Sequence, residues 1–225
     1  MLCTTAAEME LIKMTDAGRY ADPATLCSAA CRQVLAWSDW EMAAAKATYE
    51  LLRNLENVLR CTVSDRLSSH YQREDWWNAP RLRLTYSTME KIENAEDKLR
   101  QAGVQVTPTA ILREVPLGFW VTLLGRGHDY ETQVWRPVSS GFPGYRGRRA
   151  PLHSRLDHLR LLRNKVAHQD RIGSRDLAAD RRSTLIAIGY MSEAVARRVG
   201  AADTALPRLL MSRPGICAQR AGGTS

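Results

Sequence analysis

Apolar side chains recur along most of the chain at the three- and four-residue intervals that are typical of α-helices. One long run comprises Tyr49, Leu52, Leu55, Leu59 and Val63. A later run comprises Leu152, Leu156, Leu159, Leu162 and Val166. Each run gives its helix one apolar face for a core, whereas the alternating pattern of strands is weak throughout. The pattern therefore predicts an all-α protein.

Capping residues and prolines set the expected ends of these helices. Asp22–Pro23 and Thr107–Pro108 each place a capping side chain before a proline at the first helical position. Ser38 and Ser87 each begin a capping box, and Pro116 should kink or break the helix that contains it. The expected helices span residues 23–35, 38–70, 87–102, 108–124, 151–168 and 174–199, with a short helix around 130–135 in an otherwise irregular stretch.

The chain is expected to form one helical domain, residues 22–200. An extension (residues 1–21) precedes it, and a mobile tail (residues 201–225) follows, because periodicity is weak from Pro207 onward. No run of about 18 apolar residues is present, so we expect no membrane span. The first residues mix acidic and apolar side chains, which is not typical of a signal peptide.

The cysteine count indicates a reducing compartment. The five cysteines are Cys3, Cys27, Cys31, Cys61 and Cys217. An odd number in a chain of 225 residues does not favour a disulfide framework. The spacing of the pair in residues 27–31 is not that of a zinc site. We therefore expect a cytoplasmic protein in which this pair is buried as small apolar side chains.

Charge is distributed unevenly along the chain. Lys and Arg number 32 against 24 Asp and Glu, for a net charge of +8. Residues 1–135 carry a net charge of −3, and residues 136–213 carry +10. A basic half of this kind favours an anionic partner such as RNA. A basic, solvated surface without such a partner is the alternative that charge alone leaves open.

Five aromatic residues could stack on RNA bases or fill a core. They are Trp76, Trp77, Phe119, Trp120 and Trp135. Aromatic side chains in a helical domain more often supply core and interface packing, so we expect these five to be structural.

The candidate chemistry lies at the end of the helix expected over residues 151–168. Asn164 and His168 are four residues apart and share a helix face, which Arg160 extends by one turn. Arg163 lies on the flank of this face. Histidine can transfer protons at neutral pH, and Arg163 and Lys165 can bind a phosphate and stabilise its developing charge. The structural alternative is that His168 and Arg163 only interact with the last carbonyls and the helix dipole.

Templates for other site classes are absent from the sequence. It contains no P-loop, no complete Gly-x-Gly-x-x-Gly, no His-Glu-x-x-His and no nucleophile elbow. We therefore expect no metal and no organic cofactor.

The order of motifs along the chain resembles a known family. Arg163, Asn164 and His168 in the pattern Arg-Asn-x-x-x-His, late in the chain, resemble the signature of the HEPN superfamily, and more narrowly the Abi-like (abortive infection) proteins of bacteria. The resemblance runs from about Asp22 to Val199. Its parts along the chain are Leu51–Arg60, Trp76–Trp77, Val115–Leu124, Val134–Pro137, Gly141–Pro143 and Leu161–His168. The chain departs from the pattern at Gln169, after the signature histidine, and at Cys61, after Leu59–Arg60.

The resemblance implies an all-α, HEPN-like helical bundle with additional helices, commonly a homodimer in which two signature helices face one another. It implies a metal-independent endoribonuclease acting as a toxin or phage-defence effector, with an antitoxin, protein or RNA, as a possible partner. Arg163 and His168 would form the catalytic pair, with Asn164 assisting. RNA contacts are expected from Arg160, Lys165, Arg146, Arg148 and Arg149.

Two other functions stay open at this point. A HEPN-type domain could bind RNA or regulate without cleaving it. Alternatively, the helical domain could bind other proteins, and its signature helix would then serve only as an oligomer contact.

Overall fold

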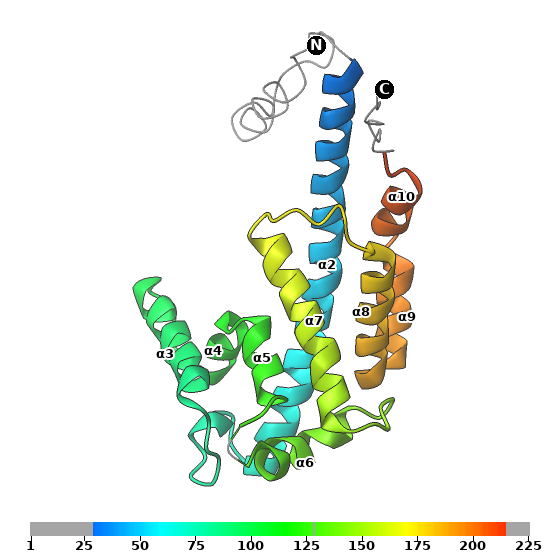
Figure 1. The fold of residues 1–225 in the computed structure, drawn as a ribbon. Helices are drawn as coiled ribbons and strands as arrows, with labels where there is room; N and C mark the ends of the chain where they lie inside the picture. Colours follow the sequence, from blue (N-terminus) through cyan, green and yellow to red (C-terminus); the bar gives the residue numbers. More distant parts are fainter. Residues whose placement is uncertain (1–28, 128, 215–225) are drawn as a thin grey trace, which may run out of the picture.

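The computed structural model describes residues 29–127 and 129–214, which form helices and connecting loops without a strand among them (Figure 1). The α-helices are α2 (Ala29–Tyr71), α3 (Tyr86–Gln101), α4 (Pro108–Glu114), α5 (Leu117–Leu123), α6 (Arg136–Val138), α7 (Arg149–Ala167), α8 (Leu177–Met191), α9 (Glu193–Ala202) and α10 (Ala205–Met211). Short 3-10 turns at Trp76–Asn78 and Ser139–Gly141 and a π-helical turn at Glu131–Trp135 complete the chain. The predicted all-α class is confirmed.

Helix α2 is the central element of the fold. It is 43 residues long, and α5, α7 and α8 all pack against it. In Figure 1, α3, α4 and α5 lie on one side of α2, and α8, α9 and α10 lie on the other. Leu52, Leu55, Leu59 and Val63 are fully buried along it, as the periodicity predicts. Tyr49, the first member of that run, is 38% exposed.

The expected helix start at Ser38 is wrong, because α2 runs without a break through that position. Glu41, the second member of the expected capping box, uses its carboxylate elsewhere: Oε1 accepts the backbone N–H groups of Ile172 and Gly173, at 2.8 and 2.6 Å. A sequence pattern cannot show a partner so distant in the chain. The expected start at residues 22–23 lies outside the described residues.

The predicted ends of the next helices, α3 to α5, lie close to the observed ends. Thr107 caps α4, because its side chain accepts the N–H of Ala110. Pro116 separates α4 from α5, as expected for a residue without a backbone N–H. Helix α3 begins at Tyr86, one residue before Ser87, so Ser87 does not cap it.

The C-terminal part differs from the single helix expected over residues 174–199. Asp176 caps α8 by accepting the N–H of Ala179, and Ser192 ends α8 and caps α9. The chain then forms α10, although the sequence pattern indicates little regular structure from Pro207 onward. Leu206 of α10 is fully buried, and the indole N–H of Trp40 on α2 donates to the Leu209 carbonyl at 2.7 Å. Residues 1–28 and 215–225 lie outside the described residues, and they include the whole predicted extension (residues 1–21) and the last part of the predicted tail.

The aromatic residues expected in the core lie there. Trp76, Trp77, Phe119 and Trp120 are buried, and the rings of Phe119 and Trp120 meet edge to face with centroids 4.9 Å apart. Trp135 is half-buried and packs on Phe142. Within the described part of the chain, no helix has the length and apolar content needed to cross a bilayer.

A buried carboxylate joins α7, α8 and the loop between them. Asp180 of α8 is 6% exposed, and Arg175 of the loop binds both of its carboxylate oxygens, at 3.0 and 3.1 Å. The ring Nε2 of His158 on α7 lies 2.9 Å from Asp180 Oδ1. Because a buried carboxylate needs such partners, Asp180 fixes the direction in which the loop approaches α8.

Candidate active site on helix α7

The apolar run of α7 determines which of its side chains can reach solvent. Leu152, Leu156, Leu159, Leu162 and Val166 are all buried, as predicted. Since these residues occupy one face of the helix, the opposite face is left to polar side chains. Most of the predicted site residues of α7 lie on this polar face, whereas Arg163 lies on the side that faces α2.

His168 lies at the predicted end of α7. Its backbone N–H still donates to the Asn164 carbonyl at 2.9 Å, whereas the next residue, Gln169, has a φ of +59°. This left-handed residue lets the N–H of Asp170 turn back to the Lys165 carbonyl, at 2.9 Å, which closes the helix. The side chain of His168 is exposed. A histidine in this position is accessible to a ligand and is held by its backbone.

Arg163 points into the contact between α7 and α2 rather than along its own helix. Its Nε lies 3.9 Å from Glu56 Oε2, and its guanidinium carbon lies 6.0 Å from the centre of the Tyr49 ring. The Nε atom is buried without a hydrogen-bond partner, while 25% of the side chain is exposed. Residues of α2 therefore hold Arg163, which the structural alternative, an interaction with the end of its own helix, does not explain.

Glu56 is a candidate site residue that sequence reasoning missed. Burial raises the pKa of this carboxyl, and the positive charges of Arg163 and Arg60, the N–H of Leu117 and the charge of Arg53 oppose that rise without cancelling it. Leu117 is the first residue of α5, so the Glu56 carboxyl lies near the start of that helix. One available signal was an acidic residue next to Leu55 in the apolar run, flanked by arginines three residues before and four after.

The remaining predicted residues of α7 take different positions. Lys165 is exposed and Asn164 is half-buried. Arg160 donates from Nε to Asp157 at 2.7 Å, and its aliphatic part lies against Gly118 of α5, where a Cβ would come within 3.4 Å of Arg160 Cδ. Arg160 is thus half-buried between α5 and Asp157, and Lys165 is the more accessible of these two cations.

The three predicted arginines of the glycine-rich loop lie at the other end of α7. Arg146 and Arg148 are exposed. Arg149 pairs with Glu131 at 2.9 Å and donates to the Gly125 carbonyl at 2.6 Å, so its guanidinium is occupied within the fold. With 19 residues in α7 and a rise of about 1.5 Å per residue, roughly 28 Å separates this loop from His168. The structure therefore does not bring the two groups together.

The loop that carries Arg146 and Arg148 is fixed to the body of the protein. The N–H of Gly144 donates to the Tyr190 carbonyl at 3.0 Å, and the hydroxyl of Tyr145 donates to the Arg148 carbonyl at 2.7 Å. The rings of Tyr145 and Tyr190 lie 4.8 Å apart. The two exposed arginines thus project from an ordered segment.

No group of three or more His, Cys, Asp or Glu side chains in the described ranges is arranged to hold a metal ion. Two acids of α2 and α7, Glu56 and Asp157, each pair with an arginine of α7. His168 can transfer a proton, and the arginines and Lys165 can bind an anion.

The raised pKa of Glu56 gives a test of stability. The folded protein holds the Glu56 proton to a higher pH than the unfolded chain, so the wild type loses stability as the pH rises from about 4.5 through the raised pKa. Glu56→Gln cannot ionise. The free energy of unfolding of this variant should therefore exceed that of the wild type by a margin that grows with pH. Urea denaturation at about pH 4 and about pH 7 measures this margin.

Glu50→Gln is the matched control, because Glu50 is an exposed residue of the same helix. Its unfolding free energy should follow that of the wild type at both pH values. A Glu56→Gln variant that is less stable than the wild type at neutral pH would show that the pairing with Arg163 outweighs the cost of burial.

Comparisons with known proteins do not place the chain in a family. The sequence matches no protein-family model, and neither the curated proteins nor the solved structures gave a match. The resemblance to the Abi-like proteins therefore rests on the motifs quoted above.

Proposed function

We propose that the protein is a metal-independent endoribonuclease of HEPN type, with a role as a cytoplasmic toxin or phage-defence effector. The observation that carries the proposal is that a fixed arginine and an exposed histidine both lie near the end of α7. Arg163 is held by Glu56 and Tyr49 of α2, and the exposed His168 follows five residues later on α7. A fixed cation and an accessible histidine near the same helix end suit a reaction at a phosphodiester.

The proposed reaction needs no group beyond these side chains and the RNA. The ribose 2′-oxygen attacks the adjacent phosphorus, its proton passes to a base, and the bond from phosphorus to the 5′-oxygen breaks. The leaving oxygen takes a proton from an acid, which gives a 2′,3′-cyclic phosphate and a 5′-hydroxyl. His168 is the proposed acid or base, Arg163 stabilises charge on the phosphate, and Asn164 positions the reacting group.

A homodimer is part of the proposal. One histidine cannot act as base and acid in the same step, whereas two copies meeting about a two-fold axis supply two. Both helices carry exposed apolar side chains: Met42 and Tyr49 on α2 are 51% and 38% exposed, and Leu161 on α7 is 49% exposed. Their exposure supports a contact between two copies at the α2–α7 face.

A non-catalytic RNA-binding module is the second candidate function. The observation that favours it is the separation of Arg146 and Arg148 from His168, because these arginines project from an ordered loop at the far end of α7. Such a loop could bind an RNA backbone without any reaction at the helix end. Salt-dependent RNA binding by a protein that cuts no RNA would select this function.

Substitution of the two site residues tests the cleavage directly. His168→Ala should lower the cleavage rate by about 10²–10⁴-fold, the range for a general acid or base, and Arg163→Ala by about 100-fold or more. RNA with 2′-O-methyl groups and DNA should resist, and cleavage should persist in EDTA. Gel assays of labelled RNA, with the ends of the products identified, measure each point.

His70→Ala and Arg198→Ala are matched controls, since both residues are exposed and lie away from the end of α7. Arg163→Lys keeps a positive charge facing the half-buried Glu56, so it separates a loss of activity from a loss of folding. Full activity of His168→Ala, or cleavage abolished by EDTA, would refute the proposed mechanism.

The dimer has its own test. Leu161→Asp places a charge among the exposed apolar residues, and should convert a micromolar dimer into a monomer and reduce cleavage. Light scattering at several concentrations measures the change. Ile186→Asp is the control, because Ile186 of α8 is also an exposed apolar residue, at 45%. A monomeric wild type at micromolar concentration contradicts this part of the proposal.

The basic loop should contribute to RNA affinity. We expect the Arg146→Ala, Arg148→Ala double variant to bind RNA more weakly, and the slope of log affinity against log salt to fall by roughly 1.4 for two lost phosphate contacts. Arg149 is left intact because it bonds to Glu131 and Gly125. Arg197→Ala with Arg198→Ala removes the same charge from α9. Equal effects of the two double variants would mean that only net charge counts.

A further inference from the structure

The chain segment that follows His168 is bound by a carboxylate of α2. Glu41 Oε1 accepts the N–H groups of two successive residues, Ile172 at 2.8 Å and Gly173 at 2.6 Å. Successive amides that converge on one anionic oxygen form strong, charge-assisted bonds. Ile172 itself is fully buried. The path of the chain is therefore fixed four residues after His168.

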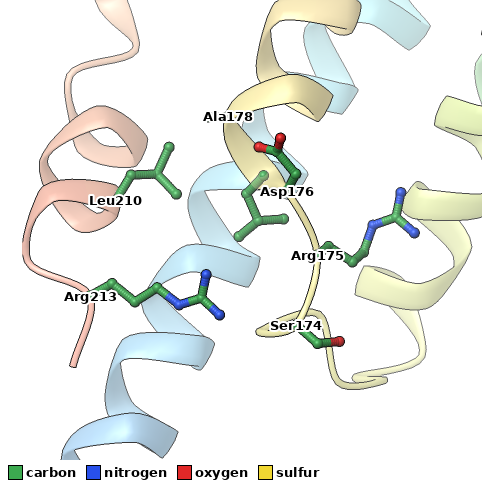
Figure 2. A pocket seen from close by; sticks show the side chains of 7 residues that line it. Ser174, Arg175, Asp176, Ala178, Leu210 and Arg213 are labelled. Atoms are coloured by element: carbon green, nitrogen blue, oxygen red, sulfur yellow. The ribbon is translucent and has the colours of Figure 1, made fainter. Parts of the chain in front are cut away.

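A residue of the C-terminal segment, Arg213, binds the same loop at the Gly173 carbonyl. Arg213 donates to the Gly173 carbonyl, and its guanidinium carbon lies 5.1 Å from the Trp37 ring centre and 5.2 Å from the Trp40 ring centre. Figure 2 shows the Arg213 side chain extending from the end of α10 toward the loop that contains Ser174. Cation–π contacts of this kind hold a guanidinium in one orientation.

Gly173 is required at the centre of this arrangement. A Cβ at this position would lie 2.7 Å from Trp37 Cζ2 and 3.0 Å from Glu41 Oε1. With its N–H on Glu41 and its carbonyl on Arg213, both of its backbone polar groups have partners. We call Glu41, Arg213 and Gly173 the loop clamp.

The loop clamp does not form part of a ligand site in the hollow beside it. This hollow, of about 380 Å³, lies between α10 and the start of α8 (Figure 2). The charged side chains around it are already engaged: Arg175 binds Asp180, Asp176 caps α8, and Arg213 binds Gly173. The loop clamp therefore acts on the chain itself.

We infer that Glu41 and Arg213 are positioning residues for His168. The inference rests on the proposed ribonuclease function for its catalytic consequence. His168 is the last residue before the chain leaves α7, and ends of helices open readily when the following segment is free. By fixing Ile172 and Gly173, the loop clamp holds the last turn of α7 closed and gives the His168 ring one orientation. No contact between the loop clamp and RNA is involved.

The experiment uses the full chain with Glu41→Ala, Glu41→Gln and Arg213→Ala. Glu41→Ala should speed amide hydrogen exchange at Ile172 and Gly173 at least tenfold, and shift the NMR signals of the His168 ring. Cleavage of a labelled RNA should show a fall in kcat of about tenfold with little change in KM. Glu41→Gln keeps an accepting oxygen and should restore most of each value. Arg213→Ala should act in the same direction.

Glu193→Ala and Arg197→Ala are the matched controls, because these residues form an exposed pair at 3.7 Å on α9. They should leave exchange, the His168 signals and kcat unchanged. Faster exchange in Glu41→Ala without a change in the His168 signals would overturn the inference and make the clamp purely structural. A wild type that cuts no RNA refutes the proposed function, while the exchange and His168 signals still decide the role of the clamp.

Discussion

The packing of the apolar face of α7 against α2 is the contact on which the rest of the candidate site depends. Because Leu156, Leu159 and Leu162 must be buried, the rotation of α7 about its axis is fixed. That rotation directs Arg163 toward Glu56 and Tyr49, and leaves Lys165 and His168 in solvent. An ordinary hydrophobic contact thus determines which polar groups can meet a ligand.

Local signals in the sequence predicted the parts of the fold that local physics controls. The helical class, the cap at Thr107, the break at Pro116 and the end of α7 at His168 all follow from nearby residues. The expected start at Ser38 is wrong because α2 continues through that position, and Glu41 accepts N–H groups of a distant loop instead. Helix α10 was missed because its stability comes from the burial of Leu206 and from Trp40, which a short helix does not reveal in its own sequence.

The candidate site was predictable on one helix only. Arg163, Asn164 and His168 lie on or next to the end of α7, as their spacing predicts. Glu56 could not be joined to Arg163 from the sequence, because nothing local shows which face of α2 meets α7. Arg149 was expected to contact RNA, a role that stays a prediction, and no pattern indicated that Glu131 and Gly125 bind it within the fold. Composition locates charge along the chain but does not show which charges are already neutralised.

The long-range bonds of Gly173 also set an order of assembly during synthesis. Ile172, whose N–H binds Glu41, is synthesised 131 residues after Glu41. Arg213, which binds the Gly173 carbonyl, is synthesised a further 40 residues after Gly173. A growing chain can form much of α2 early, but the turn after His168 cannot reach its final state until Arg213 has left the ribosome. For an enzyme of the proposed kind, which would act on RNA in the cell that makes it, the last turn of α7 would thus be completed only after translation has passed that residue.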